Sequence, residues 1–522
     1  MLLSKSDYML YLRHPAWLWL KKHDKNKLPP TDEGTQALFD EGNRFEAYAN
    51  LLFPDATKLG FIHYDSYLTL PARTKEVLAS DTKTILQGRL EAENLTCIFD
   101  VLERVEEKEY DLTEIKASTK VKPEHLYDLA FQLTVMEKAG LSIRHISVIH
   151  VNTDYVRDGE IDPAQLTVRQ DVTAQVRELM PQTSYLIASA RTVLSLESRP
   201  DISPRFVNQH SVSGLDAMKD WLAIFQSLQP QDSTPQDSTP QGTESKSTQQ
   251  QAKHPQDPFT IYRLCSPDAH QLGELEDQHI SLIKAIPLDQ ARNARQRSQI
   301  EATVRAQPLI NPAPIKEFLD GLSFPLYFFD YETFSSVIPQ FAGCRPYGQY
   351  PFQYSLHVLD TPTSPARHAE YVHGENTLPL PGLLAQLRSD IGEVGTILAW
   401  NMSYEKGRNE LMASLYPEYA VFLHEVNERM QDLMLPFAQG WYSDQNFFGS
   451  ASIKKVLPVL VPELDYHDLA IGEGMLARRL WTETIIEGNH QQDKAKILTD
   501  LRHYCTLDTY AMVRIWEELV KM

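Results

Sequence analysis

The sequence contains an aromatic stretch that ends in acidic residues, Leu326-Tyr327-Phe328-Phe329-Asp330-Tyr331-Glu332-Thr333-Phe334. A short apolar run of this kind predicts a buried strand. Side chains on a strand alternate between its faces, so Asp330 and Glu332 are expected on one face, roughly 7 Å apart along the backbone. Like charges this close repel, and burial adds to the cost. A Mg²⁺ or Mn²⁺ ion between them would remove both penalties; the alternative is an ordinary strand end with two solvated acids.

A second acid follows the predicted strand Thr396–Trp400. A helix is expected after Asn401, with Ser403 as its N-cap, which puts Glu405 in the first turn. The N-terminus of a helix stabilises an acid with or without a ligand, so a structural role for Glu405 stays open.

The last predicted helix, Leu501–Lys521, carries another acid on its apolar side. Asp508 falls within the apolar stripe, one turn after Tyr504. A carboxylate on a core face costs several kcal/mol unless something neutralises it. The candidates are a metal shared with Asp330 and Glu332, a buried hydrogen bond, or an arginine partner.

The first half of the chain predicts a compact α/β domain. Leu95–Leu102 and Tyr110–Ala117 form an expected hairpin, followed by a helix over about Pro123–Ala139 and a strand over Ile146–Val151.

Three charged side chains lie on this hairpin. Asp100 is expected to share a face with Ile98 and Leu102, and Glu114 to share one with Lys116. Hydrolysis of a phosphodiester needs a metal that holds the phosphate and activates water. Asp100 and Glu114 can hold that metal, and Lys116 can orient the water or stabilise charge; a salt-bridged hairpin is the alternative.

The composition of the chain limits the number of domains and the classes of protein to which it can belong. A chain of 522 residues with 42% hydrophobic content predicts two or three folded domains. The four cysteines lie far apart, which argues against a disulfide framework and fits a reducing cytoplasm. Met1–Leu20 lacks a continuous apolar core for a signal peptide, and no run approaches the roughly 20 apolar residues that span a membrane. The net charge of −20 counts weakly against a nucleic-acid partner, because a metal-dependent enzyme can bind phosphate through its ions.

Residues 228–258 contain Gln-Asp-Ser-Thr-Pro twice in tandem and are expected to be a disordered linker. The predicted organisation is a first α/β domain over 1–165, helical connecting regions over 166–227 and 259–318 on either side of that linker, and a second α/β domain over 319–522.

Asp100, the segment Leu112–Lys116 and Gln132 in the next helix resemble the core of the PD-(D/E)XK nucleases, in particular the RecB-like branch that includes the CRISPR-adaptation nucleases. That branch takes a further ligand from an upstream helix after a glycine, and Gly42 with Glu46 matches that place; taken alone, Glu46 is a flanking surface acid. The resemblance implies metal ligation by Glu46, Asp100 and Glu114 and catalytic roles for Lys116 and Gln132. Many relatives hold an iron–sulfur cluster through a cysteine before a proline; His14 precedes Pro15 here, so no cluster is expected.

The acids of the second half resemble the motifs of the DEDD exonucleases, which have a ribonuclease-H-like fold and two metal ions about 4 Å apart. The resemblance implies metal ligation by Asp330, Glu332, Glu405 and Asp508, with Tyr504 helping to position water. The second-motif acid is usually Asp, and Glu405 is one methylene longer. Asp432 and the segment Ser452–Lys455 resemble secondary features of such domains, with Lys454 or Lys455 facing the phosphate backbone.

The whole chain resembles the bacterial family called domain of unknown function 2779, through phrases that include Asp128–Gln132, Asn152–Gly159, Asp330–Thr333 and Tyr504–Asp508. We therefore expect a nuclease that uses Mg²⁺ or Mn²⁺, with a 3′-to-5′ exonuclease site in the second half and a RecB-like site in the first. The expected partner is nucleic acid, DNA in preference to RNA, and no membrane. The alternative is a non-catalytic nucleic-acid-binding scaffold in repair or phage defence, with one or both sites decayed.

Overall fold

The structure is a computed structural model that describes residues 1–29, 31, 33–212, 217–225, 257–466 and 469–522. It is a mixed α/β protein whose described residues form four sheets. The chain divides into unit 1 (residues 1–155, 161–258 and 267–278) and unit 2 (residues 156–160, 259–266 and 279–522). Most of the predicted disordered linker, residues 228–256, lies outside the described residues. No helix in the described part of the chain is both long and apolar enough to cross a bilayer.

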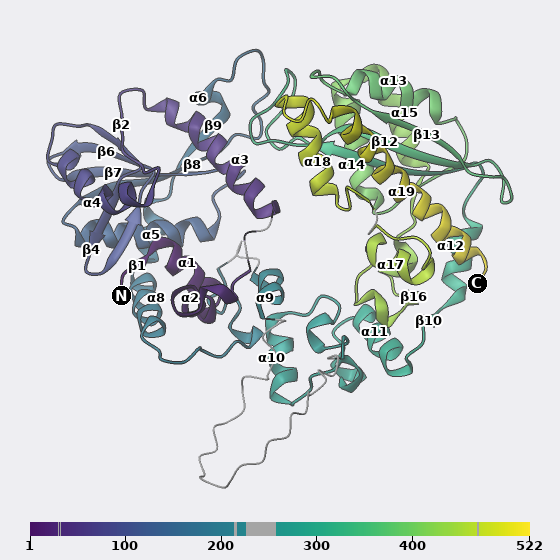
Figure 1. Ribbon diagram of the computed structural model, residues 1–522, viewed down its shortest axis with the longest axis horizontal. Helices are drawn as coiled ribbons and strands as arrows, with labels where there is room; N and C mark the ends of the chain where they lie inside the picture. The colour runs from purple at the N-terminus through teal and green to yellow at the C-terminus, as the bar shows by residue number, and fades with distance from the viewer. Residues whose placement is uncertain (30, 32, 213–216, 226–256, 467–468) are drawn as a thin grey trace, which may run out of the picture. The chain divides into compact units, whose positions relative to one another are not determined.

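Unit 1 is built on a six-stranded sheet in the order β2-β3-β6-β7-β8-β9. Its central strand β7 pairs antiparallel with β6 and parallel with β8, and helix α5 makes the crossover that a parallel pair requires (Figure 1). Strand β9 lies beyond residue 165, where we place the end of the first domain. The bounds are β2 Thr57–Lys58, β3 Thr84–Leu86, β6 Val101–Glu106, β7 Glu109–Lys116, α5 Pro123–Lys138, β8 Ser142–Val151 and β9 Thr167–Asp171.

A smaller three-stranded sheet in unit 1 has the order β1-β5-β4, with β1 Leu3–Ser4, β4 Arg89–Ala92 and β5 Leu95–Ile98. The prediction of one strand over Leu95–Leu102 is therefore wrong, since its two halves, β5 and β6, belong to different sheets. The chain changes sheet at Phe99, which is fully buried against Gly88, where an added Cβ would come within 2.3 Å of the ring. As a result, Asp100 does not share a strand face with Ile98.

The main helices of unit 1 are α1 Lys5–Arg13, α2 Pro15–His23, α3 Glu33–Ala49, α4 Tyr64–Leu78, α8 Met180–Leu194, α9 Ala217–Phe225 and α10 Ala269–Asp277. The core between the sheets and α5 is apolar and contains Phe99, Leu129 and Phe131. Helix α3 buries Phe45 and Ala49, whereas its Leu38 is 73% exposed.

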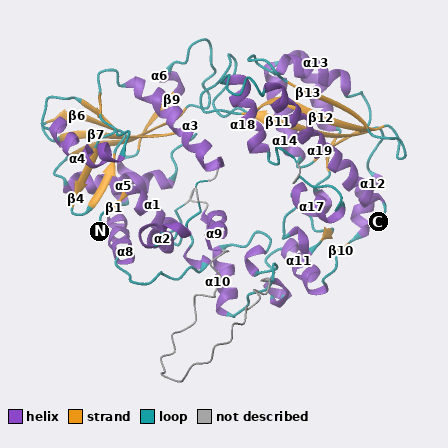
Figure 2. Ribbon diagram, viewed as in Figure 1, coloured by secondary structure: helices purple, strands orange, loops and turns teal. Residues whose placement is uncertain are grey.

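Unit 2 is built on a five-stranded sheet in the order β13-β12-β11-β14-β15. Strand β11 pairs antiparallel with β12 and parallel with β14. Figure 2 shows these strands with helices packed around them. The bounds are β11 Leu326–Phe334, β12 Tyr350–Leu359, β13 Arg367–Val372, β14 Thr396–Ala399 and β15 Met430–Asp432.

The alternation of side chains along β11 separates two cores. Tyr327 and Phe329 pack with α13 (Leu380–Asp390) and α14 (Met402–Leu415), whereas Leu326 and Phe328 pack with α19 (Lys494–Val520). The other main elements of unit 2 are α11 Ala294–Arg305, α12 Pro312–Asp320, α15 Ala420–Glu428, α17 Ile453–Leu460, α18 Gly474–Trp481, β10 Leu309–Ile310 and β16 Tyr442–Ser443.

The structure gives the predicted strand 326–334 its predicted bounds, but the last helix begins at Lys494 rather than Leu501. The predicted N-cap Ser403 is wrong. Helix α14 begins at Met402, and its N-cap is Asn401, in the left-handed region at φ 72°. The Asn401 side chain makes no capping bond; instead, the Asp432 carboxylate accepts hydrogen bonds from the backbone N–H groups of Asn401 and Met402.

Candidate functional site

Three carboxylates meet between β11 and α19. Asp330 and Glu332 continue the face of β11 that packs on α19, and Asp508 projects from that helix. One oxygen from each of the three lies within 4.8 Å of the others. Strand β14 pairs with β11 only as far as Phe328, so the acids lie beyond the end of that neighbouring strand. Among the described residues, this is the group in which three potential metal ligands come together.

Burial raises the pKa values of all three acids, and mutual repulsion adds to the rise at Asp330 and Glu332. Burial raises the pKa of Asp330 well above its usual range, and the charges of Asp508 and Glu332 raise it further. Glu332 is affected in the same way, first by burial and then by Asp508. Burial also raises the pKa of Asp508 to about 6, although a hydrogen bond from Tyr466 and the charge of Lys454 oppose the rise. A cation at this place would relieve the repulsion.

Glu405 lies beside this group but outside the 4.8 Å cluster. Its side chain is 2% exposed, and its Oε2 atom has no hydrogen-bond partner within the described part of the chain. Burial raises the pKa of Glu405 to about 8, and its charge in turn raises the pKa values of Asp330 and Glu332. All four acids line one open cavity of about 380 Å³.

Two tyrosines and a lysine lie next to the acids of this site. The Tyr466 hydroxyl donates to Asp508 Oδ1 at 2.6 Å. Lys454 Nζ donates to the carbonyl of Gly472 at 2.7 Å and lies 5.3 Å and 5.2 Å from the ring centres of Tyr466 and Tyr504. Tyr504 and Lys454 line the cavity. No pattern in the sequence marks Tyr466, because it lies in a loop outside every motif.

Two of the predicted secondary features, Asp432 and Lys454, lie beside the elements of this site. Asp432 caps α14, and its carboxylate also accepts from the backbone of Met434 at 3.0 Å, so it positions the helix that carries Glu405. Lys454 is part of the cavity wall, whereas Lys455 is exposed and does not line the cavity.

Unit 1 contains a second charged site around Glu114, which is 1% exposed. Glu114 Oε1 accepts from Lys116 Nζ at 2.7 Å and from Lys5 Nζ at 2.9 Å. Asp128 on α5 lies 2.9 Å from Lys116 Nζ and 3.2 Å from Lys5 Nζ. Gln132 Nε2 donates at 2.8 Å to both Glu114 and Asp128. Although burial opposes it, the charges of Lys116 and Lys5 hold the pKa of Asp128 well below its usual range.

Asp100 and Glu46 flank this network. Asp100 accepts from the backbone N–H of Ile115 at 2.7 Å. Burial, and then the charge of Glu114, raises the pKa of Asp100 well above its usual range. Burial also raises the pKa of Glu46, which accepts from the side chain of Gln87 and is influenced by the charges of Glu114 and Lys116.

The structure therefore brings Asp100, Glu114, Lys116 and Gln132 together, with Glu46 within electrostatic range. Lys5 and Asp128 also belong to this network, although neither was among the predicted site residues. Asp128 had a signal, because it lies one helical turn before Gln132, but nothing in the sequence connects Lys5 to residues more than 100 positions away.

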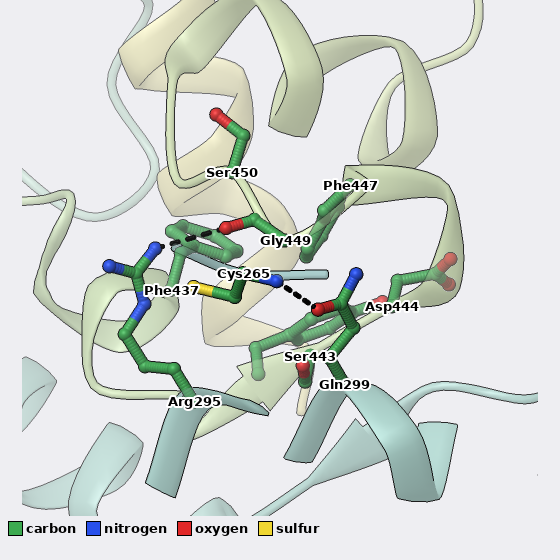
Figure 3. Close-up of a pocket in the computed structure, with 11 residues that line it drawn as sticks. Cys265, Arg295, Gln299, Phe437, Ser443, Asp444, Phe447, Gly449 and Ser450 are labelled. Carbon is green, nitrogen blue, oxygen red and sulfur yellow. Dashed lines mark hydrogen bonds between the residues drawn. The ribbon is translucent and has the colours of Figure 1, made fainter. Parts of the chain in front are cut away.

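A smaller cavity in unit 2 lies among α11, β16 and the segment around Gly449, and has a volume of about 20 Å³, room for one water molecule (Figure 3). Its polar groups are already paired. Gln299 Oε1 accepts from the N–H of Cys265 at 2.7 Å, and Arg295 donates to the carbonyl of Gly449 at 3.1 Å. We interpret this cavity as a packing feature.

Comparison with known proteins gives one family match. Residues 327–452 match the family described as Domain of unknown function (DUF2779). The matched segment includes Asp330, Glu332 and Glu405 and ends before Asp508, and it supports the family that the sequence phrases indicate. No curated protein matches the chain.

Proposed function

We propose that this chain is a divalent-metal-dependent nuclease, with its principal site at Asp330, Glu332 and Asp508 in unit 2. The observation that carries the proposal is the meeting of these three carboxylates within 4.8 Å in a cavity of about 380 Å³, each with a raised pKa. Buried acids without a neutralising partner cost folding free energy, and a cation supplies the missing charge.

The donor set fits a hard cation. All four acids offer oxygen ligands, which Mg²⁺ and Mn²⁺ prefer. The buried Oε2 atom of Glu405, without a partner in the described residues, is a ligand atom of the kind such an ion requires. Asp330, Glu332 and Asp508 would hold the first ion, and Glu405 adds a fourth carboxylate for a second. When bound, such ions hold a phosphate and lower the pKa of an attacking water.

The remaining residues orient this site. Tyr466 fixes the Asp508 carboxylate through its hydrogen bond. Tyr504 lines the cavity beside Asp508, and we assign it the positioning of water. Lys454 supplies the positive charge that acts on Glu332 and Asp508. We propose removal of nucleotides from a 3′ end, with DNA in preference to RNA as the substrate.

The two folds and the second site are part of the same proposal. The five-stranded mixed sheet of unit 2, with helices on its faces, supports a ribonuclease-H-like fold. The β6–β7 hairpin, α5 and β8 support a PD-(D/E)XK core in unit 1. There, Asp100, Glu114 and Glu46 would hold the ion and Lys116 would stabilise charge. Gln132 orients Glu114 through its hydrogen bond at 2.8 Å.

The test uses the purified full-length chain with Mn²⁺ and end-labelled single- and double-stranded DNA and RNA. We expect shortening from the 3′ end that is lost in the double variant Asp330→Asn, Glu332→Gln, and a separate activity that is lost in Glu114→Gln. Asp444→Asn is a matched control in unit 2, because Asp444 is also a buried acid (7% exposed), and asparagine keeps the oxygen that accepts from the Asn446 N–H.

Degradation that persists after both sites are removed would come from a contaminant, and the nuclease proposal would fail. A chain that binds nucleic acid, cuts none of the four substrates and takes up no Mn²⁺ would instead be the non-catalytic scaffold.

A further inference from the structure

We propose that Lys5 takes part in the function of the charged site in unit 1. It pairs with Glu114 when no divalent cation is bound, and it binds a phosphate oxygen of the nucleic acid once a cation takes its place beside Glu114. This inference rests on the nuclease function proposed for unit 1.

The position of Lys5 is built into the fold. Strand β1 pairs with β5 in parallel, Ser4 accepts from the N–H of Asp7 as the N-cap of α1, and Lys5 is the first residue of that helix. This arrangement brings Lys5 Nζ to 2.9 Å from Glu114 Oε1 and 3.2 Å from Asp128 Oδ1. The Lys5 side chain is 23% exposed.

Lys5 is held less closely than the other lysine of the site. Lys116 lies 2.7 Å from Glu114 and 2.9 Å from Asp128, each closer than the corresponding contact of Lys5. Both ammonium groups approach the same oxygen, Glu114 Oε1. A divalent cation on that oxygen must therefore displace one of them, and Lys5 has the weaker contacts.

The acids next to the two lysines provide the place for such a cation. Glu114 and Asp128 are balanced by Lys5 and Lys116, whereas Asp100 has no ion pair in the described residues. Asp100 and Glu114 are close enough for each charge to oppose the other, and both offer hard oxygen ligands, so the residues present fit Mg²⁺ or Mn²⁺. After displacement, the Lys5 ammonium group lies beside the cation, where it can contact the phosphate that the cation attracts.

Unit 1 also contains a matched ion pair that does not include Glu114 or Asp128. Lys22 lies 2.6 Å from Asp7, and the two side chains are 25% and 1% exposed, against 23% and 1% for Lys5 and Glu114. Lys21 binds the same carboxylate at 2.9 Å. Lys22→Met therefore removes a comparable ion pair without touching the charged site.

The experiment uses full-length protein in which Asp330→Asn and Glu332→Gln silence unit 2. Mn²⁺ affinity is measured from the electron paramagnetic resonance signal of free Mn²⁺, and binding of a single-stranded DNA oligonucleotide is measured in Ca²⁺ at several salt concentrations. For Lys5→Met we expect Mn²⁺ to bind more tightly by roughly tenfold, because a neighbouring positive charge is gone. We expect the oligonucleotide to bind roughly tenfold more weakly, with a salt slope smaller by about 1. Lys22→Met should change neither.

The opposite signs of the two changes are the signature of the proposed role. If Lys5→Met leaves both affinities unchanged, or weakens Mn²⁺ binding, Lys5 is a structural ion pair and the inference is wrong. Lys5→Gln keeps donors to Glu114 without the charge, and gives the same two measurements if Lys5→Met does not fold. If the parent protein binds neither Mn²⁺ nor the oligonucleotide, the proposed function of unit 1 fails first, and the role of Lys5 fails with it.

Discussion

Replacing Glu332 by Gln is expected to make unit 2 more stable while it strongly reduces the response to metal. Glu332 is 9% exposed, and its pKa is raised by burial and by Asp508. Glutamine has the same shape and carries no charge. The substitution therefore removes a repulsive charge from the cluster, and with it one of the three ligands.

The size of the gain follows from the spacing of the carboxylates. Two unit charges 4.8 Å apart repel by about 3.5 kcal/mol at an effective dielectric constant of about 20. The acids whose pKa values are raised take up protons in the folded state, and this limits the cost of the repulsion. We therefore expect Glu332→Gln to raise the free energy of unfolding by about 1–2 kcal/mol at pH 7 in EDTA.

The assay is urea unfolding in EDTA and in Mn²⁺. The unsubstituted chain should gain about 2.7 kcal/mol when Mn²⁺ is 100 times its Kd, and Glu332→Gln should gain much less. Asp7→Asn is the control of opposite sign. Although burial opposes it, hydrogen bonds from Lys22 and Lys21 lower the pKa of Asp7, so removing that charge should cost about 3 kcal/mol. If Glu332→Gln destabilised the protein in EDTA as Asp7→Asn does, Glu332 would be a paired structural acid and the metal centre would lose its basis.

Three further outcomes can be checked. In EDTA, the free energy of unfolding should fall as the pH rises from about 4 to about 8. The reason is that Asp508 and Glu405, with pKa values raised to about 6 and about 8, bind protons more tightly in the folded state. Urea unfolding at pH 5 and pH 8.5 measures this decline, and Mn²⁺ should remove it. Asp432→Ala removes the acceptor of two backbone N–H groups at the start of α14 and of the N–H of Met434, and should cost about 1–2 kcal/mol. Because α14 carries Glu405, Mn²⁺ binding measured by calorimetry should also weaken. Gly474→Ala should keep activity, since the added Cβ would lie at ordinary contact distance, 3.7 Å from the Tyr504 hydroxyl and 3.8 Å from Glu332. The larger side chain of Gly474→Leu should block cleavage of labelled DNA, while the Mn²⁺-induced Tm shift remains.

The parts of the fold that sequence could predict are those fixed by local patterns. The aromatic run of β11 specifies a buried strand, and its period of two places Asp330 and Glu332 on one face. The apolar stripe of α19 places Asp508 toward the same sheet. These patterns predicted three members of the candidate metal centre, because each pattern needs only its own segment.

The errors occur where a distant contact overrides the local pattern. Leu95–Leu102 has the composition of one strand, but Phe99 packs on Gly88, and the chain passes from one sheet to another there. Ser403 has the side chain of an N-cap, yet the Asp432 carboxylate from β15 already accepts the N–H groups at the start of α14. Tyr466 and Lys5 reach their sites from segments that carry no motif, so only the folded chain connects them to the acids.

The two sites handle buried acids in different ways, and this difference predicts how each responds to a cation. In unit 1, Glu114 and Asp128 have ammonium partners within 3.2 Å, so a divalent ion replaces an existing charge and adds little stability. In unit 2, Asp330, Glu332 and Asp508 share a cavity wall with Lys454, whose ammonium group donates to a carbonyl instead. None of these three acids has an ion pair in the described part of the chain, so a cation bound there neutralises charge that the nearby Lys454 offsets only in part. Metal-dependent stabilisation should therefore come mainly from unit 2, and the contribution of unit 1 should increase when Lys5 is removed.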